Sequence, residues 1–231
     1  MTQPQGVLYL VATPIGNLGD LSERSVESLR SSDLVACEDT RVTAKLLAHL
    51  GLARPTTSYR EENELRKAPE LAQRIEQGES IALVSDAGMP AISDPGFRLI
   101  RECRRRKLNV VPLPGPNAAL TALAASGLPT DKFLFLGFPP SKTSGRKTTY
   151  GKWRDFPGSI VFYESKHRIA KSLVDLEDVL GKDRYICVAR EMTKVHEAFH
   201  VGPAGEVRQA VSERSQKGEF VIVVAPQGYV L

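Results

Sequence analysis

The stretch VSDAGMPAISDPG, residues 84–96, concentrates two Asp, two Gly and two Pro directly behind an apolar run. A plain turn needs only two or three residues of this kind. Gly and Pro interrupt regular hydrogen bonding and leave backbone amides and carbonyls available to a ligand. We therefore interpret this stretch as a ligand-binding loop, in which Asp86 either meets a polar group of the ligand or caps the turn through its own backbone.

Two further unusual loops, TPIGN (13–17) and EDTR (38–41), also follow apolar runs. In open α/β sheets ligands bind outside the carboxyl ends of the strands, so we expect all three loops to lie at one edge of a sheet. The sequence contains neither G-x-G-x-x-G after its first strand nor G-x-x-x-x-G-K-[ST]. A glycine-rich cradle for a pyrophosphate or a nucleoside triphosphate is therefore not expected.

The segment HEAFH, residues 196–200, matches the zinc-protease pattern H-E-x-x-H. That site needs both histidines on one face of a helix. Here apolar and polar residues alternate from Val195 to Val201 and Gly202-Pro203 ends the run, which predicts a strand. Histidines four apart in a strand lie about 13 Å from each other, too far to share one zinc ion. We expect no metal site.

The segment SKTSGRKTTYGKWR, residues 141–154, carries five basic residues and no acid, with Tyr150 and Trp153 between them. This pattern suits a surface that follows phosphates and stacks bases. The alternative is a solvated loop and helix with an aromatic residue in the core. A second basic run, RECRRRK (101–107), is interpreted as the solvated face of a helix.

The elements that position these loops alternate between short strands and amphipathic helices in the first half of the chain. This alternation predicts a parallel sheet covered on both faces. The expected strands span 7–12, 34–37, 55–59, 81–84 and 109–113, with helices near 21–31, 43–50, 63–77 and 97–107. Pro69 indicates either a kink or a late start of the third helix.

The segment PLPGPN (112–117) interrupts this alternation and predicts a hinge. After the helix 118–126 the strands lie closer together and predict a mixed sheet, with strands near 133–138, 159–163, 185–190, 195–201 and 220–225 and helices near 166–180 and 203–215. The fold class is therefore α/β, with an N-terminal domain (1–116) on a parallel sheet and a C-terminal domain (117–231) on a mixed sheet.

Composition places few limits on function: the 231 residues carry a net charge of +4, which is compatible with an anionic partner. The three cysteines, Cys37, Cys103 and Cys187, are widely spaced, as expected for small buried side chains in a reducing cytoplasm. The N-terminal segment has no signal-peptide pattern and no apolar run approaches 18 residues, so a cytoplasmic protein without a membrane segment is expected.

Taken together, LYLVATPIGNLGDLS, ACEDTR, IALVSDAGMPAISDPG, VVPLPGPNAALTALAASGLPTDKFLFLGFPPSK, FYESKHRI and AREMTKVHE resemble the ribosomal RNA small subunit methyltransferase I family, part of the tetrapyrrole methylase (class III) superfamily. The resemblance implies two α/β domains with S-adenosylmethionine in the cleft between them, usually in a homodimer. It also implies methylation of the 2′-hydroxyl of a cytidine in 16S ribosomal RNA, free or within the 30S particle.

The resemblance further implies which segments lie against the cofactor. They are TPIGN (13–17), residues 84–96, which we call the long loop, the PGPNA turn and two segments of the second domain. The residues expected to contact the cofactor are Pro14, Ser85, Asp86, Gly88, Met89, Pro90, Asn117, Ala118, Tyr163, Glu191 and Met192. The expected RNA contacts are Arg41, Lys142, Arg146, Lys147 and Lys152.

A 2′-hydroxyl is a poor nucleophile, so a base that removes its proton should assist the transfer. Glu38 and Asp39, at the end of the second strand, are candidates for this role, although they could equally cap the helix that begins at Thr40. Lys194 and Glu197 form the alternative catalytic pair. A methylase of the same fold acting on a tetrapyrrole or a protein residue, a zinc hydrolase and a binding module without catalysis stay as alternatives.

Overall fold

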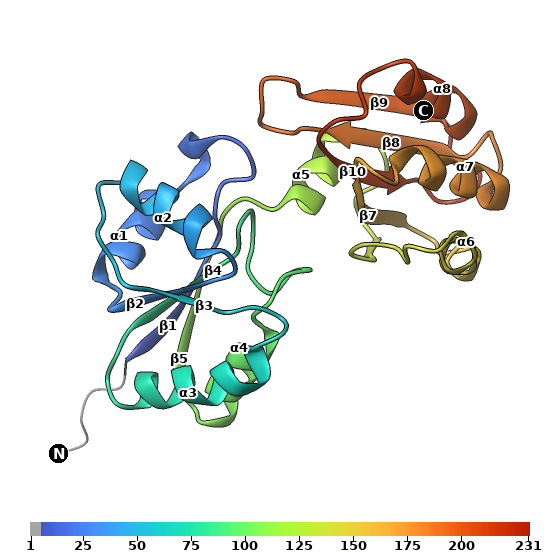
Figure 1. Cartoon of the computed structure of the whole chain (residues 1–231). Helices are drawn as coiled ribbons and strands as arrows, with labels where there is room; N and C mark the ends of the chain where they lie inside the picture. Colours follow the sequence, from blue (N-terminus) through green and yellow to red (C-terminus); the bar gives the residue numbers. More distant parts are fainter. Residues whose placement is uncertain (1–5) are drawn as a thin grey trace. The chain divides into compact units, whose positions relative to one another are not determined.

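The structure, a computed structural model, describes residues 6–231 and divides the chain into two compact units, Met1–Asn117 and Ala118–Leu231 (Figure 1). The division falls in the PGPNA turn, one residue beyond the expected boundary. Residues 1–5, with which the expected first domain begins, lie outside the described residues. Each unit is built around one five-stranded sheet.

The sheet of the first unit has the strand order β3-β2-β4-β1-β5, and every neighbouring pair is parallel. β2 and β4 are buried along their whole length, because helices cover both faces of the sheet. The strands are β1 (Val7–Val11), β2 (Leu34–Cys37), β3 (Thr56–Ser58), β4 (Ile81–Val84) and β5 (Asn109–Leu113).

Four helices and a short 3₁₀ turn connect these strands. Helices α1 and α2 pack on one face through Leu29 and Leu47, and α3 and α4 pack on the other face through residues such as Leu71 and Leu99 (Figure 1). The elements are η1 (Leu18–Asp20), α1 (Glu23–Ser31), α2 (Thr40–His49), α3 (Glu64–Glu76) and α4 (Phe97–Arg105). Since α3 begins before Pro69, the late start considered for it is wrong.

The sheet of the second unit is mixed, with the order β6-β7-β10-β8-β9. β6 and β7 are parallel, and the other neighbouring pairs are antiparallel. The strands are β6 (Phe133–Phe135), β7 (Ser159–Ser165), β8 (Tyr185–Arg190), β9 (Ala198–Pro203) and β10 (Glu219–Val224).

Helices cover both faces of this second sheet as well. One face packs against α6, α7 and α8, and the other packs against α5. The helices are α5 (Ala118–Ala125), α6 (Thr143–Lys152), α7 (Ile169–Leu180) and α8 (Ala204–Ser212). The expected α/β fold class is confirmed. None of the helices within residues 6–231 has the length and hydropathy needed to span a bilayer.

Candidate functional site

The loops that follow β1 and β4 are joined by backbone hydrogen bonds at the carboxyl edge of the first sheet. Thr13 and Gly88 exchange two of them, at 2.9 and 3.0 Å. The Thr13 hydroxyl donates to the Ser85 carbonyl, and the Ser85 hydroxyl donates to the Gly88 carbonyl, both at 3.0 Å. Pro14 follows Thr13 and is half-buried. These contacts use the Ser85 hydroxyl within the loop, so Ser85 shapes the loop rather than offering its side chain.

The long loop contains an unusual amount of left-handed backbone. Gly88 has φ of 89°, and Ala91 and Ser93 have φ of 69° and 65°. Non-glycine residues adopt this conformation at a cost and are enriched where a loop is shaped for function. A Cβ at Gly96 would lie 2.9 Å from the Ala91 Cβ, so only glycine fits there. Between these positions Met89 is half-buried and Pro90 is buried.

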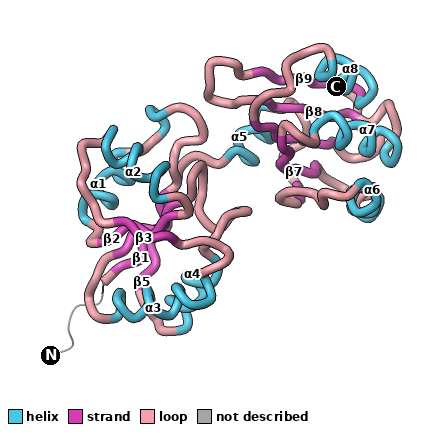
Figure 2. The backbone as a smooth tube through the Cα atoms, in the orientation of Figure 1, coloured by secondary structure: helices cyan, strands magenta, loops and turns pink. Residues whose placement is uncertain are grey.

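Two further segments meet the same edge. The Asp39 amide donates to Asp86 Oδ1 at 3.1 Å, which ties the loop after β2 to the long loop. A Cβ at Gly115 would lie 2.8 Å from the Ala12 Cβ, so the PGPNA turn packs against the end of β1. Asn117 ends the first unit and Ala118 begins α5, and both are half-buried. Figure 2 displays the connecting segments of this sheet as pink loops between magenta strands and cyan helices.

Three carboxylates at this edge interact electrostatically: Glu38, Asp86 and Asp94, which we call the strand-end carboxylates. Burial raises the pKa of Glu38, and the charge of Asp86 raises it further. Burial raises the pKa of Asp94 to about 6, with added repulsion from Glu38 and Asp86 that a hydrogen bond from Ser85 opposes. Mutual repulsion of this kind favours either a bound proton or a bound cation.

Asp39 has a different role from its neighbour. Its carboxylate caps α2 by accepting from the Arg41 amide at 2.8 Å and forms an ion pair with the Arg41 guanidinium at 2.6 Å. These hydrogen bonds hold the pKa of Asp39 well below its usual range. The capping role is therefore the one observed, and a carboxylate held in this way is a poor base. Arg41 itself is exposed.

Sequence reasoning missed two residues of this edge. Asp94 lies in the second S-D pair of the long loop, and that repetition was the available signal. Arg60, after β3, donates from Nε to the Glu38 carbonyl at 2.8 Å, and its charge lowers the pKa of Glu38. Nothing in the sequence around Arg60 indicated this contact.

The predicted site residues of the second unit gather near the ends of β7, β8 and β10. Tyr163 of β7 and Met192, after β8, belong to the apolar cluster on the α5 face of the sheet. Glu191 has φ of 50° and a carboxylate that accepts from Lys194 Nζ at 2.9 Å. Lys194 also pairs with Glu219 at 2.8 Å.

These contacts affect the proposed catalytic role of Lys194. Burial opposes its charge, but the carboxylates of Glu219 and Glu191 raise its pKa above the ordinary lysine value. A lysine with a raised pKa keeps its proton and is poorly suited to remove one. Its predicted partner Glu197 instead accepts a hydrogen bond from the Thr193 amide at 2.7 Å.

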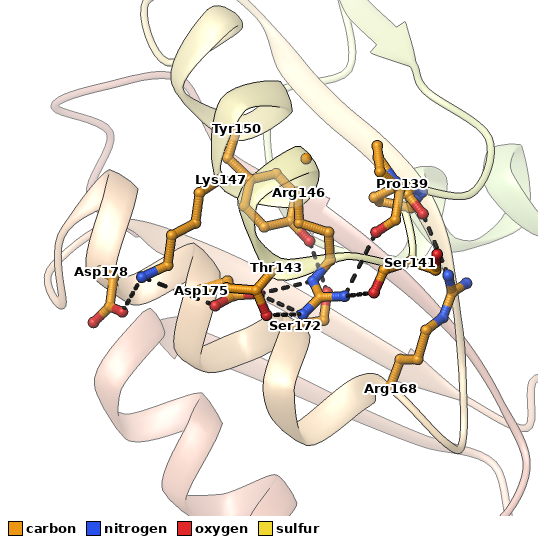
Figure 3. Close-up of polar contacts among 12 residues, drawn as sticks. Pro139, Ser141, Thr143, Arg146, Lys147, Tyr150, Arg168, Ser172, Asp175 and Asp178 are labelled. Atoms are coloured by element: carbon orange, nitrogen blue, oxygen red, sulfur yellow. Dashed lines mark hydrogen bonds and ion pairs between the residues drawn. The ribbon is translucent and has the colours of Figure 1, made fainter.

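The prediction that Arg146 binds RNA is wrong, because its side chain is 2% exposed. Its guanidinium donates from Nε to Asp175 at 2.9 Å, and also binds the Ser141 carbonyl and the Thr143 hydroxyl (Figure 3). Tyr150, on the same helix, is buried and hydrogen-bonds to Ser172 at 2.7 Å. The basic segment therefore turns one arginine and one aromatic ring inward, as the alternative interpretation expected for the aromatic residue.

The other basic residues of this segment lie at the surface. Lys147 pairs with Asp178 at 2.8 Å (Figure 3). Lys142, before α6, and Lys152, at its end, are exposed, and Lys152 lies 4.8 Å from the centre of the Trp153 ring. Lys142 and Lys152 thus stay available as RNA contacts, and Lys147 keeps 38% of its side chain exposed in its pair with Asp178.

The HEAFH segment does not form a helix. His196 and Glu197 lie in the turn before β9, while Ala198, Phe199 and His200 belong to the strand. The strand begins three residues later than expected, because Lys194 and Glu197 take part in the preceding turn. The zinc-protease arrangement requires a helix, so this structure does not form it.

Comparison with known proteins identifies the family. The family model described as Tetrapyrrole (Corrin/Porphyrin) Methylases matches residues 7–208. The ribosomal RNA small subunit methyltransferase I of Escherichia coli O157:H7 is 48% identical over 222 residues, which cover 95% of this chain and 78% of that protein. The chain belongs to the ribosomal RNA small subunit methyltransferase I family, within the tetrapyrrole methylases. The family expected from the sequence is confirmed.

One further relative and two solved structures are also similar to this chain. The relative from Synechocystis sp. is 45% identical over 220 residues, covering 95% of this chain and 79% of that protein. Diphthine synthase superposes with a TM-score of 0.74 at 14% identity, covering 96% of this chain and 90% of its own. The methyltransferase CobJ superposes with a TM-score of 0.71 at 20% identity, covering 98% and 96%. At these identities the two structures establish the shared fold alone.

Proposed function

We propose that this methyltransferase transfers the methyl group of S-adenosylmethionine to the 2′-hydroxyl of a cytidine in small-subunit ribosomal RNA. The relatives that are 43–48% identical over some 95% of the chain carry the name of ribosomal RNA small subunit methyltransferases. The observation in this chain that carries the proposal is the acidic, Gly- and Pro-rich edge formed by the loops after β1, β2 and β4.

The chemistry of that edge fits the cofactor. S-adenosylmethionine is a sulfonium cation with an amino-acid tail and a ribose. Its recognition needs exposed backbone, apolar walls and a few carboxylates, not a nest of amides for an anion. The strand-end carboxylates repel one another, so a nearby cation would relieve that repulsion. Gly88, with φ of 89°, gives the loop a backbone conformation that residues with a side chain rarely adopt.

When bound, the cofactor supplies an electrophilic methyl group. The protein's own task is to align the nucleophilic oxygen with that group and to accept the proton of the hydroxyl. Glu38 is the group that we assign to the proton, because its pKa is raised and Asp39 is held as the α2 cap. Arg60 donates to the backbone carbonyl of Glu38 and thereby holds the main chain that carries the Glu38 carboxylate.

The remaining assignments follow the family resemblance. We propose that Tyr163, Glu191 and Met192 contribute to cofactor binding and that Arg41, Lys142, Lys147 and Lys152 contact RNA phosphates. We further propose a homodimer acting in the cytoplasm, where ribosomal RNA is modified. The alternative substrates, a tetrapyrrole or a protein residue, have support only from the shared fold.

A labelled-methyl transfer assay tests the function directly. The substrates are small subunits, and RNA extracted from them, taken from cells that lack this protein. We expect label in a single cytidine ribose, located by mapping the modified nucleotide. Label on a base, or no transfer to either substrate while the protein binds S-adenosylmethionine, would refute the proposal.

A further inference from the structure

A small pocket lies in the second unit, where β8, β9 and β10 meet the C-terminal end of α8. Arg190 and His200 line it from the strands, Arg214 and Ser215 line it from the turn after α8, and Val211 and Phe220 form its apolar walls. The pocket therefore combines donors and apolar surface, and all three of its ionisable side chains are bases.

The strand register explains why these side chains converge. Phe220 pairs with Arg190, and His200 pairs with Val188, two residues before Arg190. Paired residues and residues two apart point to the same face of a sheet. That face is the one packed against α6, α7 and α8, whereas Tyr163 and Met192 lie in the cluster on the opposite face.

Acidic side chains do not bind the arginines of the pocket directly: within residues 6–231, neither Arg190 nor Arg214 forms an ion pair. Arg190 donates from Nε to the Lys217 carbonyl at 2.8 Å, which orients its guanidinium. Burial lowers the pKa of His200, and the charges of Arg214 and Arg190 lower it further.

The acids closest in sequence to these bases bind elsewhere. Glu191 and Glu219 both pair with Lys194. Glu213, at the end of α8, accepts a hydrogen bond from Gln209. Against the effect of burial, the charge of Arg190 lowers the pKa of Glu191, but neither Glu191 nor another acid within residues 6–231 forms an ion pair with Arg190 or Arg214, so an anion would stabilise the three bases.

We propose that this pocket binds a backbone phosphate of the RNA substrate, at a nucleotide away from the one that is methylated. Guanidinium groups bind phosphate oxygens through paired, charge-assisted hydrogen bonds, and the imidazole and hydroxyl of His200 and Ser215 supply further donors. Val211 and Phe220 exclude water on one side, which strengthens those contacts. The pocket lies on the face packed against α6, α7 and α8, opposite the face of Tyr163 and Met192, so we assign it to RNA flanking the reacting cytidine. The inference rests on the proposed function, because only an RNA substrate brings a flanking phosphate.

The test compares Arg214→Gln with Lys171→Gln as a matched control. Both residues are exposed and both changes remove one positive charge, but Lys171 lies on α7 outside the pocket. Binding of a small-subunit ribosomal RNA fragment is measured by fluorescence anisotropy between about 50 and 200 mM salt. The dependence of log K on log salt should become shallower by roughly 0.7–0.9 for Arg214→Gln, the value for one lost phosphate contact. Lys171→Gln should leave it unchanged, and Arg214→Lys should restore most of it.

A second measurement separates RNA from free phosphate. The His200 ring is followed by NMR during titration with inorganic phosphate and with the RNA fragment, and the RNA should raise its pKa at far lower concentration. Equal salt slopes for Arg214→Gln and Lys171→Gln would overturn the inference, and so would a His200 shift with phosphate but none with RNA. Methyl transfer by the wild-type protein is recorded in parallel, so a failure of the pocket is distinguished from a failure of the proposed function.

Discussion

Replacing Asp94 by Asn tests whether the folded protein holds a proton on this carboxyl at pH values where the unfolded chain has released it. The pKa of Asp94 is raised from an ordinary 3.8 to about 6, chiefly by burial and then by Glu38 and Asp86. Between those two values the folded state binds a proton that the unfolded state has released. The stability that Asp94 contributes is therefore complete below pH 3.8 and is lost as the pH rises through about 6.

The magnitude follows from the size of this shift. Two pKa units correspond to roughly 3 kcal/mol, at 1.36 kcal/mol for each unit. The carboxyl keeps some contact with solvent, so screening reduces the expected effect to roughly 1–2 kcal/mol. Asn retains the shape and the acceptor oxygen without the charge. The variant should match the wild type near pH 4 and exceed its unfolding free energy by roughly 1–2 kcal/mol at pH 8, or about 2–8 °C in Tm.

Thermal unfolding of both proteins at intervals from pH 4 to pH 8 measures the difference. Asp20→Asn serves as the control, because Asp20 is exposed at the end of η1 in the same unit. The control should track the wild type at every pH. A difference in Tm between Asp94→Asn and the wild type that stays constant across this range would refute the electrostatic reasoning, because a contact that involves no charge does not change with the protonation of Asp94.

Three further outcomes are expected. Glu38→Gln should slow single-turnover methyl transfer at saturating cofactor by about 100-fold, because the variant cannot accept the proton of the hydroxyl. Calorimetry should find a cofactor affinity within a few-fold of the wild type. Equal transfer rates for the variant and the wild type would show that Glu38 does not accept the proton. Arg146→Gln should lower the unfolding free energy measured in urea by about 3–5 kcal/mol, because it leaves Asp175 buried without its partner, and a loss below about 1 kcal/mol would contradict that account. The double variant Lys142→Gln with Lys152→Gln should reduce the salt slope of RNA binding by roughly 1.5 with Tm unchanged, and an unaltered slope would assign both lysines to solvent.

The basic segment illustrates how far sequence reasoning reached. It located the exposed Lys142 and Lys152, but it grouped Arg146 with the surface lysines and left open whether an aromatic residue stacks on RNA or lies in the core, as Tyr150 does. The partner that draws Arg146 inward is Asp175, 29 residues later on α7. An arginine alone in the sequence gives no sign of such a partner, because its burial is stable only when a carboxylate is buried with it.

The edge of the first sheet gives a more favourable case. The unusual composition of residues 84–96 identified the loop, and the positive φ of Gly88 and Gly96 accounts for its two glycines. The composition of the loops at this edge did not show which role each acid has. Asp39 caps α2, whereas the charge of Glu38 raises the pKa of Asp94, although 56 positions separate the two residues in the sequence.

The sequence by itself determined the fold class, most of the elements and, through the resemblance of its motifs, the family. The elements depend on periodicity and on turn residues, which act over a few neighbouring positions and are visible in one strand or helix at a time. Only the tertiary structure decided which charged groups are buried, paired or left facing one another, as in Arg146 with Asp175 or Arg190 with His200. The reason is that the energy of a charge depends on the partners and the solvent around it, and folding brings those partners from distant parts of the chain.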